Sequence, residues 1–144
     1  MKYYQRIPLF LFQISMDTPM YAHEWIKFNP EYNYTVFDDE RCAAMVSAYN
    51  NSLVSKAYAK ILEGVIRADI CRLTILHMLG GVYADADVIP YASLKSVIPA
   101  NASFVASEWY SFEFIMSIPG HPFIENALMR SAQNIITEVR QCAA

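Results

Sequence analysis

One stretch, residues 65–87, constrains the fold of this chain more than any other. Apolar side chains surround most of a predicted helix over residues 65–79, so that helix is expected to be buried. The chain has four glycines, and two of them are adjacent at Gly80-Gly81, where the helix is expected to end because glycine suits the left-handed conformation there. Residues 82–84 then predict a short strand. The sequence therefore predicts a buried helix that turns back sharply into a strand.

Two charged residues interrupt the apolar surface of this helix. Asp69 and Arg72 are three residues apart and so share one face of the helix. Charged groups on a buried helix are unfavourable unless they are paired or used for binding. The spacing alone fits part of a ligand site, with a simple ion pair within the helix as the alternative.

Two aspartates, Asp85 and Asp87, follow the predicted strand directly. Open α/β sheets bind ligands at the carboxyl ends of their strands, and the alternation of a strand predicts that both side chains point the same way. Two close carboxylates repel each other and favour a bound cation, and oxygen ligands suit Mg²⁺ or Mn²⁺. The same tripeptide is common in solvated turns, so by itself it leaves both interpretations open.

The geometry of the hairpin connects the two pairs of charged residues. From Asp69 or Arg72 the helix rises roughly 10–15 Å, at about 1.5 Å per residue. From Gly81 to Asp85 an extended strand returns roughly 13 Å, at about 3.3 Å per residue. Asp85 is therefore expected to lie level with Asp69 and Arg72, and we predict that these residues line one pocket.

The rest of the chain predicts an α/β fold in one domain over residues 1–144. Asp38-Asp39 offers a helix N-cap. The pattern of apolar residues predicts strands over 7–14, 32–37, 82–84, 103–107 and 112–117, and helices over 19–28, 40–49, 52–61, 65–79 and 122–139.

Composition excludes several classes of protein. The chain is 55% hydrophobic with a net charge of -3, which argues against a disordered chain and against a nucleic-acid partner. The most apolar early stretch, residues 7–14, is too short to span a membrane, so no membrane span is expected. Cys42, Cys71 and Cys142 lie far apart without zinc-ligand spacing, and we expect them to be buried or free thiols in a reducing compartment.

Three motifs carry a resemblance to a known family: Arg67-Ala68-Asp69-Ile70-Cys71-Arg72, Gly80-Gly81-Val82-Tyr83 and Asp85-Ala86-Asp87. Together they resemble the sugar-binding DXD region of glycosyltransferases. The family is that of the initiating α-1,6-mannosyltransferases and the bacterial capsular-polysaccharide sugar transferases (glycosyltransferase family 32), with the clostridial glucosylating toxins as more distant relatives. Flanking similarity runs from residue 7 to residue 123 in the family's order. Phe12 stands where the family has histidine, and Phe37 where it has tryptophan.

The resemblance implies a GT-A-like fold, a mixed sheet flanked by helices, with a short C-terminal part. It also implies a metal-dependent, retaining glycosyltransferase that moves a sugar from a nucleoside-diphosphate sugar to a glycan or other hydroxyl acceptor. Retention proceeds through a carboxylate nucleophile or by front-face attack, and no nucleophile is assigned. The expected cofactor is Mn²⁺ or Mg²⁺.

The resemblance further implies roles for individual residues. Asp87 would bind the cation directly, and Asp85 would contact the metal through water as well as the ribose or sugar. Asp69 and Arg72 would hold sugar hydroxyls, and these four residues are the expected catalytic set. The substrate-binding set is completed by Tyr83 and by the backbone around Gln13 and Ile14, which would meet the nucleobase.

Two alternatives compete with this interpretation. Asp85-Ala86-Asp87-Val88 also fits the local pattern of haloacid-dehalogenase phosphatases, although that pattern leaves Asp69 and Arg72 unexplained. A truncated or non-catalytic domain that only binds a nucleotide sugar is the other alternative. The expected location is cytoplasmic or membrane-peripheral for a bacterial or viral protein, and the Golgi lumen for part of a longer eukaryotic one.

Overall fold

Five strands form one mixed sheet in the computed structural model, which describes residues 6–107 and 112–142. Their order is β2-β1-β3-β5-β4. In this order, β1 pairs in parallel with both β2 and β3, whereas β5 pairs antiparallel with β3 and β4. The strands are β1 (Phe10–Ile14), β2 (Asn33–Phe37), β3 (Gly81–Ala84), β4 (Phe104–Ala106) and β5 (Phe114–Ser117).

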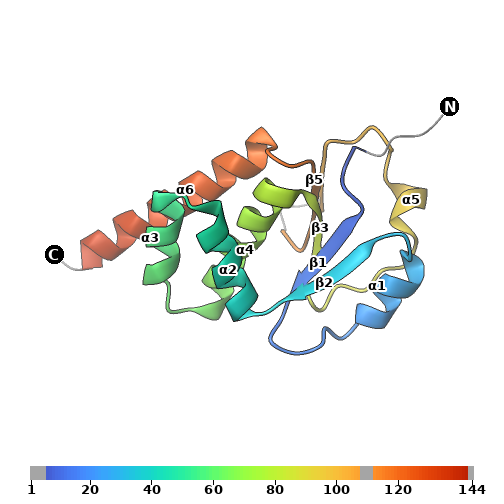
Figure 1. The fold of residues 1–144 in the computed structure, drawn as a ribbon, viewed down its shortest axis with the longest axis horizontal. Coiled ribbons are helices and arrows are strands. Elements are labelled where there is room, and N and C mark those ends of the chain that lie inside the picture. The colour runs from blue at the N-terminus through green and yellow to red at the C-terminus, as the bar shows by residue number, and fades with distance from the viewer. Residues whose placement is uncertain (1–5, 108–111, 143–144) are drawn as a thin grey trace.

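Helices cover both sides of this sheet (Figure 1). Helices α2, α3, α4 and α6 lie together on one side, and α1 and the short α5 lie on the other. The expectation of a mixed sheet flanked by helices is therefore confirmed. The helices are α1 (Ala22–Phe28), α2 (Asp39–Tyr49), α3 (Ser52–Lys60), α4 (Gly64–Leu79), α5 (Leu94–Val97) and α6 (Pro122–Cys142). No helix in the described ranges combines the length and the apolar character that crossing a bilayer requires.

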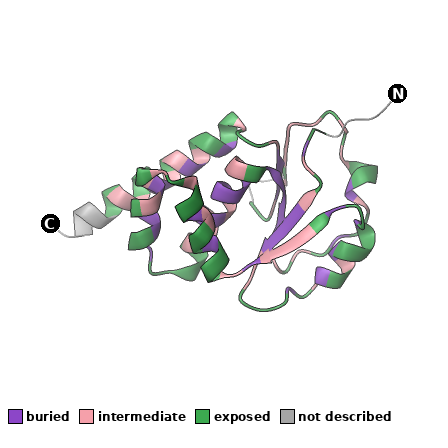
Figure 2. Cartoon of the chain, in the orientation of Figure 1, coloured by how far each residue is buried: buried purple, intermediate pink, exposed green. Residues whose placement is uncertain are grey.

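Successive strand residues build two separate hydrophobic cores. Phe12 and Tyr83 pack on the side of α2, α3, α4 and α6, while their neighbours Leu11 and Val82 pack on the side of α1 and α5. This division follows from the alternation of side chains along a strand. Figure 2 shows the buried residues concentrated in β1, β3 and β5 and on the inward faces of the helices. The two cores fix β1 and β3 side by side and so set the position of the residues that follow them.

The turn between α4 and β3 has the conformation that the paired glycines predicted. Gly80 and Gly81 have φ angles of 65° and 100°, which residues with a side chain rarely adopt. A Cβ on Gly81 would lie 2.5 Å from the carbonyl oxygen of Phe10 in β1. The absence of a side chain therefore allows β3 to lie against β1.

The substitution Gly81→Ala is expected to destabilise the fold strongly. Both the left-handed backbone and the contact with Phe10 oppose a methyl group, which together predict a loss of roughly 2–5 kcal/mol in the free energy of unfolding. Urea denaturation measures this loss. Gly64→Ala is the matched control, because a Cβ there meets no atom within 4 Å and alanine suits a helix. Equal stability of the two variants would contradict the steric explanation.

Several predicted boundaries differ from the structure for local reasons. The first strand begins at Phe10 rather than at residue 7, because the Phe10 N–H donates to the carbonyl of Pro8 in a turn. The first helix begins at Ala22, and its N–H closes a turn on the carbonyl of Pro19. The sequence did not predict α5, since four residues are too few to show helical periodicity.

The expectation of free thiols is wrong for Cys42 and Cys71, which form a disulfide. Their Cα atoms are 5.4 Å apart, and both side chains are buried where α2 packs on α4. Each residue looks like an ordinary core position in the sequence, and the two face each other only after the helices pack. The bond therefore joins α2 to the helix that carries Asp69 and Arg72.

Reduction of this disulfide is expected to lower the stability of the protein. The bond closes a loop with a sequence separation of 29 residues, and the loss of that constraint costs about 3–4 kcal/mol in the chain-entropy treatment. Guanidinium denaturation with and without dithiothreitol measures the difference. A Cys42→Ala/Cys71→Ala variant, whose stability should not respond to dithiothreitol, is the control. Equal stability of the oxidised and reduced wild type would contradict the prediction.

Candidate functional site

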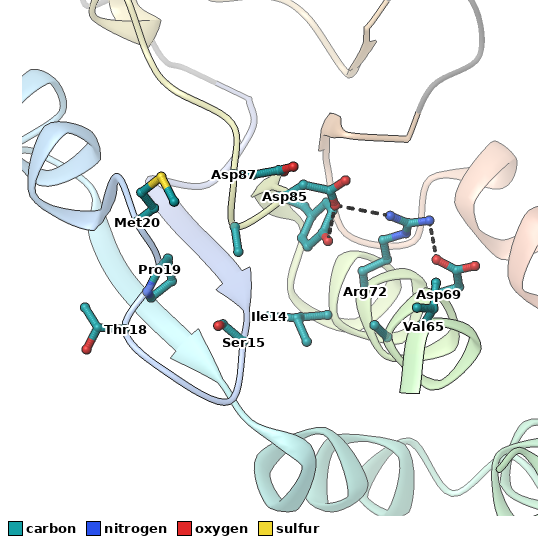
Figure 3. A pocket seen from close by; sticks show the side chains of 13 residues that line it. Ile14, Ser15, Thr18, Pro19, Met20, Val65, Asp69, Arg72, Asp85 and Asp87 are labelled. Carbon is teal, nitrogen blue, oxygen red and sulfur yellow. Dashed lines mark hydrogen bonds and ion pairs between the residues drawn. The ribbon is translucent and has the colours of Figure 1, made fainter. Parts of the chain in front are cut away.

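A cavity of about 640 Å³ opens at the carboxyl ends of β1 and β3. Its size is typical of a site for a small organic ligand. Figure 3 shows the loop after β1 on one side of this cavity and α4 on the other, with the two aspartates that follow β3 near its centre. The lining residues are Ile14, Ser15, Thr18, Pro19, Met20, Val65, Ala68, Asp69, Arg72, Tyr83, Asp85, Ala86 and Asp87.

Arg72 is the centre of the charged part of this cavity. It forms an ion pair with Asp69 one turn away and lies 3.5 Å from Oδ1 of Asp85. It also donates to the carbonyl oxygen of Phe112 at 3.3 Å, and its guanidinium lies 5.3 Å from the ring centre of Tyr83. The predicted proximity of Asp69, Arg72 and Asp85 is confirmed. The ion pair within the helix and the pocket exist together, so the two interpretations of that spacing were not exclusive.

Asp85 is a partly buried carboxylate held by two neighbours. Its side chain is 32% exposed and accepts a hydrogen bond from the hydroxyl of Tyr83. Burial raises the pKa of Asp85 above its usual range, while Tyr83 and Arg72 favour the charged form and Asp87 opposes it. Burial, and then the bond to Asp85, raises the pKa of Tyr83 well above its usual range, so this hydroxyl remains a donor.

Asp87 is the more accessible of the two aspartates. It lies in a turn after the end of β3 at Ala84, so strand alternation is not the reason that both carboxylates reach the cavity. Among the described residues Asp87 forms no ion pair, whereas Asp85 is engaged by Arg72. Asp87 thus offers an exposed carboxylate, unpaired within the described part of the chain, beside the carboxylate of Asp85 that Arg72 engages.

The donor chemistry of the cavity fits a hard divalent cation. Two carboxylates face the same space, and Mg²⁺ is typically held by one or two carboxylates together with water and the oxygens of a substrate phosphate. Within residues 6–107 and 112–142, no group of three or more His, Cys, Asp or Glu side chains is arranged to hold a metal. The chain therefore offers a partial ligand set that a phosphate-bearing substrate can complete.

Gln13 and Ile14 differ in their relation to the cavity. Ile14 lines the cavity, but the side chain of Gln13 is fully buried and does not line it. Its amide donates to the carbonyl oxygen of Asp85 and accepts a hydrogen bond from Tyr34. The amide is therefore engaged within the protein, and the prediction that the backbone around these residues meets a nucleobase stays a prediction.

One wall of the cavity, the loop after β1, was not predicted from the sequence. Ser15, Thr18, Pro19 and Met20 line it, and Met20 is 75% exposed. A possible signal was present, because this loop follows the carboxyl end of a parallel strand, where open sheets bind ligands. Only the structure places the loop opposite α4 (Figure 3).

Other acidic and histidine candidates have structural explanations. Asp38 caps α2 by accepting from the N–H of Arg41 at 2.9 Å, as predicted. His121 accepts from the N–H of Phe123 at the start of α6 and stacks on Phe104. The segment Glu108-Trp109-Tyr110, whose residues suit either an acceptor platform or a plain loop between strands, lies outside the described residues.

Comparison with known proteins identifies the family of this chain. Residues 17–104 match the family described as "Glycosyltransferase sugar-binding region containing DXD motif". This range includes Asp69, Arg72, Asp85 and Asp87. The resemblance identified from the motifs is therefore confirmed, and the phosphatase alternative gains no support.

Two curated relatives are initiation-specific alpha-1,6-mannosyltransferases. The chain is 35% identical to that of Schizosaccharomyces pombe over 106 residues, which cover 67% of this chain and 27% of the relative. It is 32% identical to that of Candida albicans over 71 residues, which cover 48% of this chain and 18% of the relative. The matched region is thus well under two thirds of either relative.

A solved structure shows the same fold. The PaToxG glycosyltransferase superimposes with a TM-score of 0.68 at 17% identity, covering 92% of this chain and 62% of that one. At this identity the likeness concerns the fold alone, and it confirms the expected GT-A-like arrangement.

Proposed function

Because the chain belongs to the family of glycosyltransferase sugar-binding regions that contain a DXD motif, we propose that it binds a nucleoside-diphosphate sugar and transfers the sugar to a hydroxyl acceptor. One observation carries this proposal. The exposed carboxylate of Asp87 and the paired carboxylate of Asp85 face the same cavity as the guanidinium of Arg72. A diphosphate needs cationic partners and a sugar needs hydrogen-bonding ones, and this cavity offers both.

Each charged side chain has a distinct role in the proposal. Asp69 is 44% exposed and accepts hydrogen bonds from sugar hydroxyls. Arg72 offsets the charge of the diphosphate and holds Asp85 in place. The hydroxyl of Tyr83 orients the carboxylate of Asp85, which leaves the other oxygen of Asp85 for the ligand.

Asp87 and Asp85 would hold a divalent cation, Mn²⁺ or Mg²⁺. When bound, such a cation neutralises the charge that develops on the departing diphosphate. Because Asp87 is exposed and unpaired among the described residues, it is the side chain best suited to bind the cation directly. Asp85, already bonded to Tyr83 and close to Arg72, would contact the cation through water.

The donor sugar and the stereochemistry extend the proposal. Mannose is the first sugar to test, since both curated relatives are named as mannosyltransferases. Retention of the anomeric configuration is carried over from the family. NMR analysis of the first product formed distinguishes it from inversion, and an inverted product would overturn this part of the proposal.

The proposal is tested by thermal stabilisation with a panel of nucleoside-diphosphate sugars, in Mn²⁺ and then in EDTA. A donor present at about 100 times its Kd should add roughly 2.7 kcal/mol to stability. A shift that requires both the donor and Mn²⁺ supports the site and identifies the donor. The absence of any shift on folded protein would overturn the proposal.

Transfer itself requires a separate assay, because a domain that only binds the donor is the second candidate. The observation that favours a domain that only binds the donor is that the curated relatives are several times longer than the region matched here. Release of nucleoside diphosphate from the bound donor, with or without a mannoside acceptor, supports catalysis. Metal-dependent binding without any release supports a binding domain.

We also propose that the protein works in an oxidising compartment, as the Golgi-lumen alternative predicts. The buried disulfide between Cys42 and Cys71 supports this location, because such bonds persist in secretory compartments and are rare in the cytosol. Thiol labelling of the protein from freshly lysed cells under denaturing conditions tests it. Labelling of both cysteines without prior reduction would overturn the proposal.

A further inference from the structure

Two buried side chains hold the backbone of the turn that carries Asp85 and Asp87. Nε2 of Gln13 donates to the carbonyl oxygen of Asp85 at 2.8 Å, and Nε1 of Trp25 donates to that of Val88 at 2.9 Å. The turn itself is closed by the N–H of Val88, which donates to the carbonyl of Asp85 at 3.0 Å. Each end of the turn is therefore bonded to a side chain from the first quarter of the chain.

Tyr34 fixes the direction in which the Gln13 amide points. Its hydroxyl donates to Oε1 of Gln13 at 2.6 Å, and the amide nitrogen faces the carbonyl of Asp85, which can only accept a hydrogen bond. A reversed amide would bring two oxygens together at Asp85 and leave Tyr34 facing a donor. The side chain of Gln13 is fully buried, so its amide depends on these partners within the protein. The two hydrogen bonds, from Tyr34 to Gln13 and from Gln13 to Asp85, can therefore both form in only one orientation of the amide.

The orientation of the Trp25 ring is fixed by packing. Its side chain is 3% exposed, and its ring stacks on that of Phe114 with centroids 6.3 Å apart and an angle of 10° between the planes. Phe114 pairs with Ala84, the last residue of β3. The indole N–H is therefore aimed at the turn from a ring that the sheet itself supports.

We propose that Gln13 and Trp25 are positioning residues for the cation, acting through the carbonyl groups of Asp85 and Val88, with Tyr34 acting through Gln13. This inference rests on the proposed function, because it takes Asp85 and Asp87 as the ligands of the cation. Two neighbouring carboxylates repel each other, and an unsupported turn would relax so that they separate. The two hydrogen bonds oppose that relaxation and keep the carboxylates facing one space.

The test measures Mn²⁺ affinity from the electron paramagnetic resonance signal of free Mn²⁺, with GDP or UDP as the diphosphate and no turnover. Gln13→Met and Trp25→Phe keep apolar bulk but remove the hydrogen bonds to the turn. Loss of a group that orients metal ligands typically weakens metal affinity by 10- to 100-fold. We expect about a tenfold loss for these two variants and a smaller one for Tyr34→Phe.

Ser117→Ala is the matched control for a purely structural effect. Ser117 is fully buried and its hydroxyl donates to a backbone carbonyl at 3.1 Å, but it pairs with Gly81 at the opposite end of β3. We expect the control to lose stability while it keeps wild-type Mn²⁺ affinity. All affinities are measured well below the melting temperature of each variant.

The outcomes separate this inference from the proposed function. Turn variants that bind Mn²⁺ within twofold of wild type would overturn the inference and leave the proposed function standing. A wild type that binds no Mn²⁺ with either nucleotide would overturn both. If Gln13→Met does not fold, Tyr34→Phe decides, because it removes one hydroxyl and keeps the ring.

Discussion

Replacing Asp87 with alanine is expected to abolish the Mn²⁺-dependent stabilisation of the protein by its sugar donor. Asp87 is the exposed carboxylate of the cavity, and Asp85 alone, held near Arg72 and bonded to Tyr83, is a poor substitute. In the wild type, a donor at about 100 times its Kd adds roughly 2.7 kcal/mol, or about 5–10 °C in Tm. A 100-fold loss of affinity would reduce this gain to about 0.4 kcal/mol.

The same substitution should leave the unliganded protein at least as stable as the wild type. Asp87 raises the pKa of Asp85 by like-charge repulsion, so its removal relieves an unfavourable interaction. A stable protein that has lost its metal-dependent ligand response is the expected signature of a site residue.

Asp39→Ala is the matched control for the loss of one exposed aspartate. Asp39 lies in the first turn of α2, outside the cavity. It should keep the full donor response, because it contacts neither of the two carboxylates. Differential scanning fluorimetry in Mn²⁺ and in EDTA compares the three proteins. An unchanged donor response in Asp87→Ala would show that the cation, if bound, is held elsewhere.

The hairpin of α4 and β3 could be predicted from the sequence because each of its signals is local. The apolar pattern marks the helix, and the two glycines mark where it ends and the short strand begins. The resulting lengths of helix and strand bring Asp85 level with Arg72. Counting residues along two regular elements predicts that the two residues lie at one level, and the structure places Arg72 3.5 Å from Asp85.

The interactions that the sequence did not reveal all join segments far apart in the chain. The disulfide links residues 29 positions apart, Trp25 reaches Val88 over 63 positions, and Gln13 reaches Asp85 over 72. No periodicity or local motif encodes such contacts, because they depend on which helix faces which strand. Gln13 illustrates the difference: the resemblance implied only a ligand contact for the backbone around it, whereas the hydrogen bond from its side chain to Asp85 became visible in the structure.

Replacing Arg72 with methionine is expected both to destabilise the protein and to abolish donor binding. The arginine side chain is 13% exposed and neutralises Asp85, which would otherwise lie partly buried beside Asp87 and Glu113. Removing one partner of a buried ion pair costs more than an exposed pair contributes, but Asp85 keeps some contact with water. We therefore expect a loss of roughly 1–3 kcal/mol in the free energy of unfolding, measured by urea denaturation.

A double-mutant cycle separates the ion pair from the packing of the arginine. Asp85→Asn removes the charge that Arg72 neutralises, so the double variant should be less destabilised than the sum of the single ones. Arg72→Lys should recover part of the stability but little donor binding, because lysine keeps the charge and loses the planar fork that spans Asp69 and Asp85.

Arg67→Met provides the comparison within the same helix. Arg67 lies over the ring of Tyr58 at 5.0 Å and does not line the cavity, so its loss should affect packing and leave donor binding intact. If Arg67→Met and Arg72→Met weakened donor binding equally, the effect would lie in α4 as a whole. If only Arg72→Met weakened it, the guanidinium acts in the cavity, where it holds Asp85 beside the carboxylate of Asp87 and faces the charge of the diphosphate.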